Sequence, residues 1–125
     1  MKKVKIGLIG AGRIGKLHGE NLAHSVAEAE LYAVADPFMN DATREWAADM
    51  GIENVYDDPE KIFTDPSIDA VFICSSTNTH ADFIIRAAKA GKHIFCEKPI
   101  DTKLSKIQEA LDAVEAAELN CRLAS

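Results

Sequence analysis

The feature that most constrains the fold is a glycine-rich segment directly after the first apolar run. Val4 to Ile9 is apolar apart from Lys5 and Gly7, and helix-forming residues extend from Arg13 to about Ala23. Between them the chain reads Gly-Ala-Gly-Arg-Ile-Gly, residues 10–15. A strand, a tight glycine turn and a helix in this order predict the start of a βαβ unit, in which the strands run parallel.

The rest of the chain continues this alternation. Apolar runs predict strands over residues 31–35, 54–56, 68–74 and 93–96, and the spacing of apolar residues predicts helices over 41–50, 59–64, 81–88 and 104–119. The segment from Ala70 to Cys74 has no polar residue, as in the middle of a parallel sheet, and residues 120–125 could only begin a sixth strand. The pattern predicts an α/β fold, a doubly wound parallel sheet of the Rossmann type with helices on both faces.

Size and charge narrow the possible functions. A chain of 125 residues, 47% of them hydrophobic, fits one globular domain over residues 1–125. A net charge of −6 makes nucleic acid and anionic membranes poor partners. No apolar stretch resembles a leader peptide or a membrane span, so we expect a cytoplasmic protein.

Cysteine and histidine spacing gives no sign of a disulfide framework or a metal site. Cys74, Cys96 and Cys121 are an odd number at wide intervals, and we expect three reduced core residues. His18 and His24 fall within and near the end of the first predicted helix, where packing and the helix dipole explain them. We therefore predict no metal site.

The glycine segment carries the first candidate binding site. In a G-x-G-x-x-G turn that follows a strand and opens a helix, Gly10 permits the tight turn, Gly12 lets a pyrophosphate approach the backbone, and Gly15 lets the helix pack closely. The helix N-terminus adds free N–H donors and a positive dipole end, so Arg13 and Ile14 join the predicted cofactor-binding residues. The alternative is an ordinary glycine loop.

Asp36 stands 21 residues after Gly15, at the end of the second predicted strand. A carboxylate there accepts hydrogen bonds from the ribose hydroxyls of a dinucleotide and repels the 2′-phosphate of NADP. Since no basic residue stands beside it, we predict NAD as the cofactor. The alternative is that Asp36 and Pro37 only form a turn.

Two further polar clusters follow predicted strands and should reach the same edge of the sheet. Glu97 and Lys98 come at the end of the fifth predicted strand. Neither solvation nor helix propensity explains a lysine at the end of a buried strand, so we expect a catalytic role for Lys98. Helix capping by Thr79 and Asp82 would also explain the cluster that follows the fourth strand. The residues of that cluster predicted to contact cofactor are Ser75, Ser76, Thr77, Asn78 and His80.

These motifs, with Cys-Glu-Lys-Pro-Ile-Asp at residues 96–101, resemble the glucose-fructose oxidoreductase, inositol dehydrogenase and MocA family over essentially the whole chain, and most of all its inositol 2-dehydrogenases. The resemblance implies a nicotinamide-dependent dehydrogenase that acts on a secondary alcohol of a polyol or sugar. It also implies that Lys98, of the Glu-Lys-Pro triplet, is the catalytic lysine and lies beside the cofactor with Glu97.

Members of this family continue beyond the point that corresponds to Ser125 into a second, substrate-binding domain, which supplies an aspartate and a histidine that work with the lysine. We therefore expect a truncated NAD(H)-binding half, inactive alone, that meets its polyol or sugar substrate only with a second domain. The alternative is a stand-alone, non-catalytic NAD(H)-binding module that pairs with itself or another chain. Either way, an uncovered interdomain surface would favour a homo-oligomer.

Overall fold

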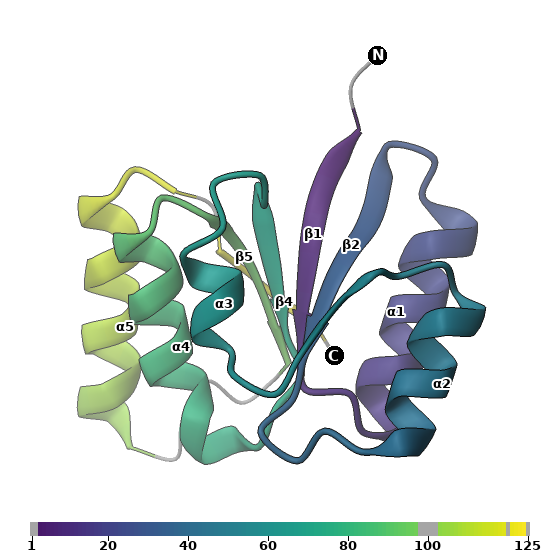
Figure 1. The fold of residues 1–125 in the computed structure, drawn as a ribbon. Coiled ribbons are helices and arrows are strands. Elements are labelled where there is room, and N and C mark those ends of the chain that lie inside the picture. The colour runs from purple at the N-terminus through teal and green to yellow at the C-terminus, as the bar shows by residue number, and fades with distance from the viewer. Residues whose placement is uncertain (1–2, 98–102, 120, 125) are drawn as a thin grey trace.

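The computed structural model describes residues 3–97, 103–119 and 121–124. Strands and helices alternate along the chain (Figure 1). The strands are β1 (Val4–Ile9), β2 (Ala29–Ala35), β3 (Asn54–Tyr56), β4 (Ala70–Ile73), β5 (His93–Glu97) and β6 (Cys121–Ala124). The helices are α1 (Arg13–Ser25), α2 (Asp41–Asp49), α3 (Glu60–Phe63), α4 (Thr77–Lys89) and α5 (Leu104–Ala116).

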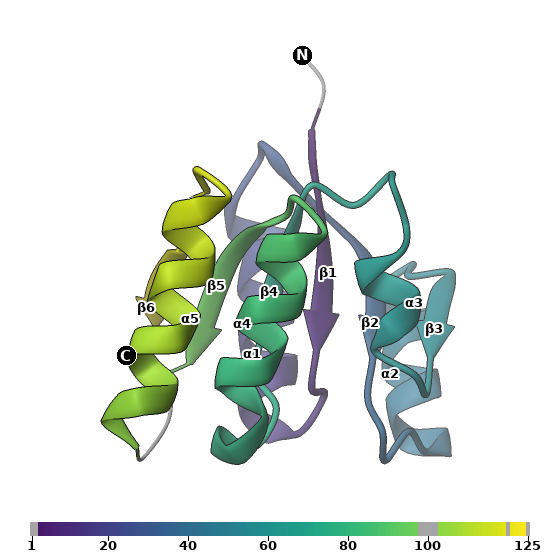
Figure 2. The same ribbon diagram turned by 90° about the vertical axis from the view of Figure 1, so that its left-hand side faces the viewer.

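All strand pairs are parallel, and the order across the sheet is β3-β2-β1-β4-β5-β6. The chain therefore builds outward from β1 in one direction and then returns to build outward from β4 in the other. Helices α1 and α2 cover one face of the sheet, whereas α3, α4 and α5 cover the opposite face (Figures 1 and 2). The predicted doubly wound α/β fold is confirmed.

Two apolar cores explain why the strands carry almost no polar residues. In β4, Val71 and Ile73 belong to the core beneath α3, α4 and α5, while Ala70 and Phe72 belong to the core beneath α1 and α2. Successive side chains of a strand point to opposite faces, so a strand covered on both sides must be apolar throughout.

In the part of the chain that the structure describes, helices cover only one face of the sheet at β5. In β5, Ile94 and Cys96 are buried toward α4 and α5, whereas His93 and Phe95 on the alternate positions are exposed. Helices α1 and α2 lie over the β1–β2–β3 side of the sheet and leave this part of the other face open (Figure 1). Phe95 consequently shows 43% of its surface to solvent.

The start of α4 differs from the prediction. We expected a helix over residues 81–88, with capping by Thr79 and Asp82 as an alternative account of the polar cluster before it, but α4 begins at Thr77 with Ser76 as its N-cap. Thr79 is the third residue of the helix, and Asp82 pairs with Arg86 one turn later. The polar segment therefore contributes most of its length to the helix.

Among the described residues, none of the helices has the length and apolar composition that crossing a membrane requires.

Candidate functional site

The carboxyl ends of the central strands form one row across the sheet. In the strand register Ile9 pairs with Ala35 and with Ile73, and Ile73 pairs with Cys96. The residues that follow these positions therefore leave the sheet at the same edge. The strand order reverses between β1 and β4, in the middle of this edge. An open α/β sheet offers a crevice at this edge.

That crevice is a pocket of about 260 Å³. It contains three of the segments singled out in the sequence: the glycine turn, Asp36 and the residues after β4. Its lining residues are Gly10, Gly12, Asp36, Pro37, Phe38, Cys74, Ser75, Ser76, Thr79 and Phe83.

The three glycines of the turn differ in what a side chain at each would meet. Gly10 has φ +94°, and a Cβ there would lie 2.5 Å from the backbone nitrogen of Ser75. A Cβ on Gly15 would lie 2.0 Å from the carbonyl oxygen of Gly10, so α1 packs directly on the turn. A Cβ on Gly12 would meet nothing within 4 Å. Gly10 and Gly15 are therefore needed by the fold, whereas Gly12 leaves open space above the turn.

The N-terminus of α1 borders this open space. Gly12 is its N-cap and has no side chain to accept the first-turn N–H groups, and no acidic residue lies in that turn. Unpaired N–H groups and the positive end of the helix dipole favour an anion. Arg13 and Ile14, both predicted cofactor residues, are exposed at the start of the helix. Both also line a separate groove between α1 and Trp46 of α2.

Asp36 connects the end of β2 to the glycine turn. One oxygen of its half-buried carboxylate accepts the backbone N–H of Ala11 at 2.7 Å, and the other accepts the N–H of Phe38 at 2.8 Å. The turn that we considered as an alternative role for Asp36 is present, and it coexists with the contact to the glycine turn. A carboxylate has about four acceptor positions, so two stay free for a ligand.

The segment after β4 is held by its own side chains. Thr79 Oγ1 donates to the Ser76 carbonyl at 2.6 Å, so Ser75 Oγ is the donor in its 2.7 Å hydrogen bond to Thr79 Oγ1. His80, which we predicted to contact cofactor, is only 2% exposed, and its Nε2 lies 2.7 Å from the Ser75 carbonyl oxygen. It does not line the pocket. His80 instead fixes the backbone of a residue that does.

Two other predicted residues of this segment also lie away from the pocket. Thr77 is half-buried in the first turn of α4. Asn78 accepts a hydrogen bond of 2.7 Å from Ser76 Oγ and lines a small groove toward α5. Of the five predicted positions in this cluster, Ser75 and Ser76 line the pocket.

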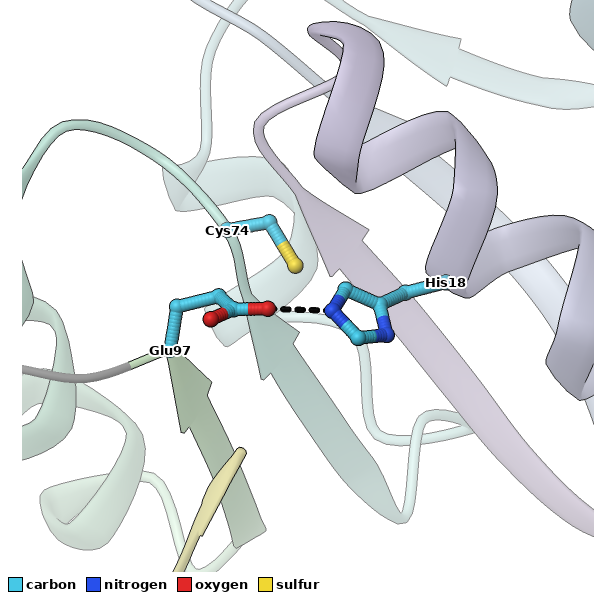
Figure 3. Close-up of side chains that lie close together, drawn as sticks. All are labelled: His18, Cys74 and Glu97. Atoms are coloured by element: carbon cyan, nitrogen blue, oxygen red, sulfur yellow. Dashed lines mark hydrogen bonds and ion pairs between the residues drawn. The ribbon is translucent and has the colours of Figure 1, made fainter. Parts of the chain in front are cut away.

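His18, Cys74 and Glu97 converge from α1, the end of β4 and the end of β5 (Figure 3). His18 Nε2 is hydrogen-bonded to the Glu97 carboxylate, and its ring stacks on Phe72 at 4.8 Å between centroids. We expected packing and the helix dipole to explain His18, and the sequence did not indicate this polar partner. It lies 79 positions along the chain, beyond any local pattern.

The same three residues offer one nitrogen, one sulfur and one oxygen within 4.8 Å of one another. No metal-ligand spacing exists in the sequence, yet the fold assembles this donor set. Burial, followed by the nearby Glu97 carboxylate, raises the pKa of the Cys74 thiol to about 12. The thiol is therefore protonated at neutral pH, and the hydrogen bond to Glu97 already occupies His18 Nε2.

Lys98, our predicted catalytic residue, lies outside the described residues, and so do the residues that follow it up to 102. The sequence also missed pocket residues. Phe38, Cys74 and Phe83 line the pocket, but in the sequence they were only a turn neighbour and two apolar residues of predicted elements. No local signal distinguishes them from core residues.

Comparison with known proteins agrees with this geometry. A family model described as an oxidoreductase family with an NAD-binding Rossmann fold matches residues 4–125. The myo-inositol 2-dehydrogenase of Thermotoga maritima is 43% identical over 116 residues, which cover 93% of this chain and 34% of that protein. The inositol 2-dehydrogenase of Rhizobium meliloti is 47% identical over 89% of this chain and 32% of its own length.

Solved structures give the same result. The scyllo-inositol dehydrogenase of Lactobacillus casei with bound NAD(H) and scyllo-inositol superposes with a TM-score of 0.91 at 34% identity, over 98% of this chain and 36% of that one. The chain thus spans about a third of the length of the relatives it matches. With residues 4–125 matched by the family model, the chain belongs to the Gfo/Idh/MocA family of oxidoreductases with an NAD-binding Rossmann fold.

Proposed function

We propose that the pocket between β1, β2 and β4 binds NAD(H) with its pyrophosphate at Gly12 and its adenosine ribose at Asp36. The observation that carries the proposal is the hydrogen bond from Ala11 to Asp36, which places the free acceptor positions of a carboxylate beside an uncapped helix N-terminus. The N-terminus of α1 would stabilise the negative charge of the phosphates, and the Asp36 carboxylate would accept hydrogen bonds from the ribose hydroxyls. The open space at Gly12 fits the group.

Titration of the chain with NADH, NADPH and ADP-ribose tests this proposal. We expect NADH and ADP-ribose to bind and NADPH to bind more weakly, because its 2′-phosphate would lie against the Asp36 carboxylate. Calorimetry and nicotinamide fluorescence provide the measurement. Equal affinity for NADH and NADPH would contradict the role of Asp36, and absence of binding would contradict the site.

The chain serves, in this proposal, as the cofactor half of a dehydrogenase that oxidises a secondary alcohol of a polyol such as inositol. Bound NAD supplies a hydride acceptor. Lys98 would hydrogen-bond the reacting hydroxyl and assist removal of its proton. Glu97 ends β5 immediately before it and is held by His18, so the strand end that leads to Lys98 is anchored to α1.

We further propose that residues 1–125 alone do not oxidise inositols. The relatives named above are about three times as long as this chain. In this proposal the additional residues position the substrate, which can contribute about 7 to 11 kcal/mol to barrier reduction. NADH formation at 340 nm with myo-inositol, scyllo-inositol and glucose measures this. Turnover that disappears in Lys98→Ala would contradict the proposal.

The alternative of a self-associating, non-catalytic module is favoured by one observation, the exposed Phe95 on the uncovered face of β5. Association through this face would give a homo-oligomer that Phe95→Glu returns to a monomer in sedimentation equilibrium. A monomer of 13.6 kDa at micromolar concentration in the unaltered chain would contradict it.

We place the protein in the cytoplasm, which the three free cysteines support.

A further inference from the structure

We propose that Phe38 is the platform of an adenine subsite, with its ring stacked on the base of the dinucleotide. The inference rests on the proposed binding of NAD(H). Among the large apolar side chains of the described residues, Phe38 is the most exposed, with 85% of its surface open to solvent. It also lines the pocket that contains Asp36 and Gly12.

The backbone around Phe38 is fixed, although its ring is free of the core. Its N–H donates to Asp36 Oδ1 at 2.8 Å, and the N–H of Met39 donates to the Asp36 carbonyl at 3.0 Å. This turn depends on the aspartate and on backbone groups, so it would form with almost any residue at position 38. The turn therefore does not explain why an aromatic ring stands there, facing solvent.

The chemistry of the ligand places a base next to this ring. In adenosine the base leaves the sugar at C1′ and the phosphate leaves through C5′, on opposite sides of the ring oxygen. A ribose whose hydroxyls meet Asp36, and whose phosphate lies at Gly12, therefore directs its base away from the glycine turn. Pro37 and Phe38 follow Asp36 directly in the chain and line the same pocket.

The start of α4 also lines the pocket. Ser76 and Thr79 stand there, with their hydroxyl groups already engaged within the segment, Ser76 with Asn78 and Thr79 with the Ser76 carbonyl. A base in this space would meet an aromatic face more readily than free hydrogen-bonding groups. Stacking accepts any base with a π-face, so hypoxanthine should replace adenine with little loss.

Four variants test the inference: Phe38→Ala, Phe38→Leu, Phe38→Tyr and, as a control, Leu111→Ala, an exposed leucine on α5 that does not line the pocket. Base–aromatic stacking predicts that Phe38→Ala weakens the binding of NADH and of ADP-ribose by the same factor, about 5- to 150-fold. Phe38→Leu keeps apolar area without a π-face and should lose part of this. Phe38→Tyr and Leu111→Ala should bind as the unaltered chain does.

The readouts separate stacking from a distorted site and from a failed proposal of NAD(H) binding. In the complex with ADP-ribose, we expect nuclear Overhauser effects between the Phe38 ring protons and adenine H2 or H8. If the unaltered chain binds ADP-ribose but shows no such effect, or if Phe38→Ala binds it equally well, the adenine subsite is wrong and NAD(H) binding stands. If the unaltered chain binds neither NADH nor ADP-ribose, both proposals are wrong.

Discussion

His18 on α1 and Glu97 at the end of β5 are hydrogen-bonded to each other although 79 positions separate them in the sequence. The side chains are 23% and 20% exposed, and the pair spans the part of the sheet edge between α1 and β5 (Figure 3). The His18 ring stacks on Phe72, which in turn stacks on Phe95, so the contact continues as a row of rings across β4 and β5. The pair thus joins the helix of the glycine turn to the strand that leads to Lys98.

Removing one partner should therefore destabilise the chain. We expect His18→Ala to lower the free energy of unfolding by about 1 to 3 kcal/mol, because a half-buried carboxylate then loses its partner. Urea unfolding of His18→Ala, Glu97→Gln and the double variant measures the coupling. His24→Ala is the control, since His24 is exposed on the same helix. Strict additivity of the two single changes would contradict an interaction.

Gly12 and Gly15 should respond in opposite ways to a larger side chain. Gly12→Val should keep the fold and lose NADH binding, because a Cβ there meets nothing in the protein but occupies the space proposed for the pyrophosphate. Gly15→Ala should lose stability, because its Cβ would overlap the Gly10 carbonyl. Circular dichroism, thermal unfolding and NADH titration of each variant test this. Unaltered affinity in a folded Gly12→Val would assign the turn a structural role only.

Asp36→Ala should reduce the preference for NADH over NADPH, chiefly by relieving repulsion of the 2′-phosphate. It should also cost about 1 to 3 kcal/mol of stability, since the N–H groups of Ala11 and Phe38 lose their acceptor. Asp36→Asn keeps one acceptor oxygen without the charge and separates the two effects. Paired titrations with both cofactors provide the measurement, and an undiminished preference in Asp36→Ala would contradict the assignment.

The cysteines should react slowly while the chain is folded. Burial, followed by the charge of Glu97 for Cys74 and by Cys121 for Cys96, raises the pKa of each of these two thiols from 9.0 to about 12. Since the thiolate is the nucleophile, alkylation by iodoacetamide near pH 8 should be about a thousandfold slower than in urea. Mass spectrometry of single-cysteine variants gives the rates. Folded-state rates within tenfold of those in urea would be inconsistent with the buried thiols.

Lys92 should make stability depend on pH in the alkaline range. Its side chain is 4% exposed, Nζ donates to the carbonyls of Asp65 and Ile68 at 2.7 and 2.8 Å, and burial lowers its pKa below 10.5. The unfolded chain therefore binds more protons between the lowered pKa and 10.5, so this group adds stability as pH rises through that window. Neutral lysine keeps two donors for the two carbonyls.

Lys92→Met removes the titrating group. It also removes both hydrogen bonds, but that loss is the same at every pH, so the change of the difference with pH reports the titration of Lys92. The difference in unfolding free energy between the unaltered chain and Lys92→Met should grow from pH 8 to pH 10.5. Lys89→Met, on the exposed end of α4, is the matched control and should show no such growth. A constant or shrinking difference for Lys92 would contradict the lowered pKa.

The elements themselves were largely predictable because their signals are local. Apolar runs gave β1 and β4, and the positions of Gly10, Gly12 and Gly15 gave the turn with the spacing seen in the structure. The boundary of α4 was wrong because several residues near its start can cap a helix. Ser76 takes that place through its backbone conformation, without a side-chain hydrogen bond, and no sequence pattern records this choice.

The site was predictable only where one strand end determines a residue's position. Asp36 follows β2 directly, Ser75 is the second residue after β4, and both line the pocket. The burial of His80 and the partner of His18 depend on how α4 and α1 pack on the sheet. Contacts between residues far apart in the chain produce no repeating pattern in a single sequence, so they cannot be predicted from it.

The strand order has a consequence for how the molecule comes together. Residues 4–56 form the β1–β2–β3 half from neighbouring segments, and β4, β5 and β6 form the other half, which docks by pairing β4 with β1. The backbone of Ser75 meets Gly10 across that seam, and the Cys74 N–H donates to the Ile9 carbonyl at 2.7 Å. Since this pairing closes a long loop, it should be among the later steps of folding. A dinucleotide that touches Asp36 on one half and Ser75 on the other would act as a clamp on the seam, so its binding should slow hydrogen exchange along the β1–β4 ladder more than at the outer strand pairs.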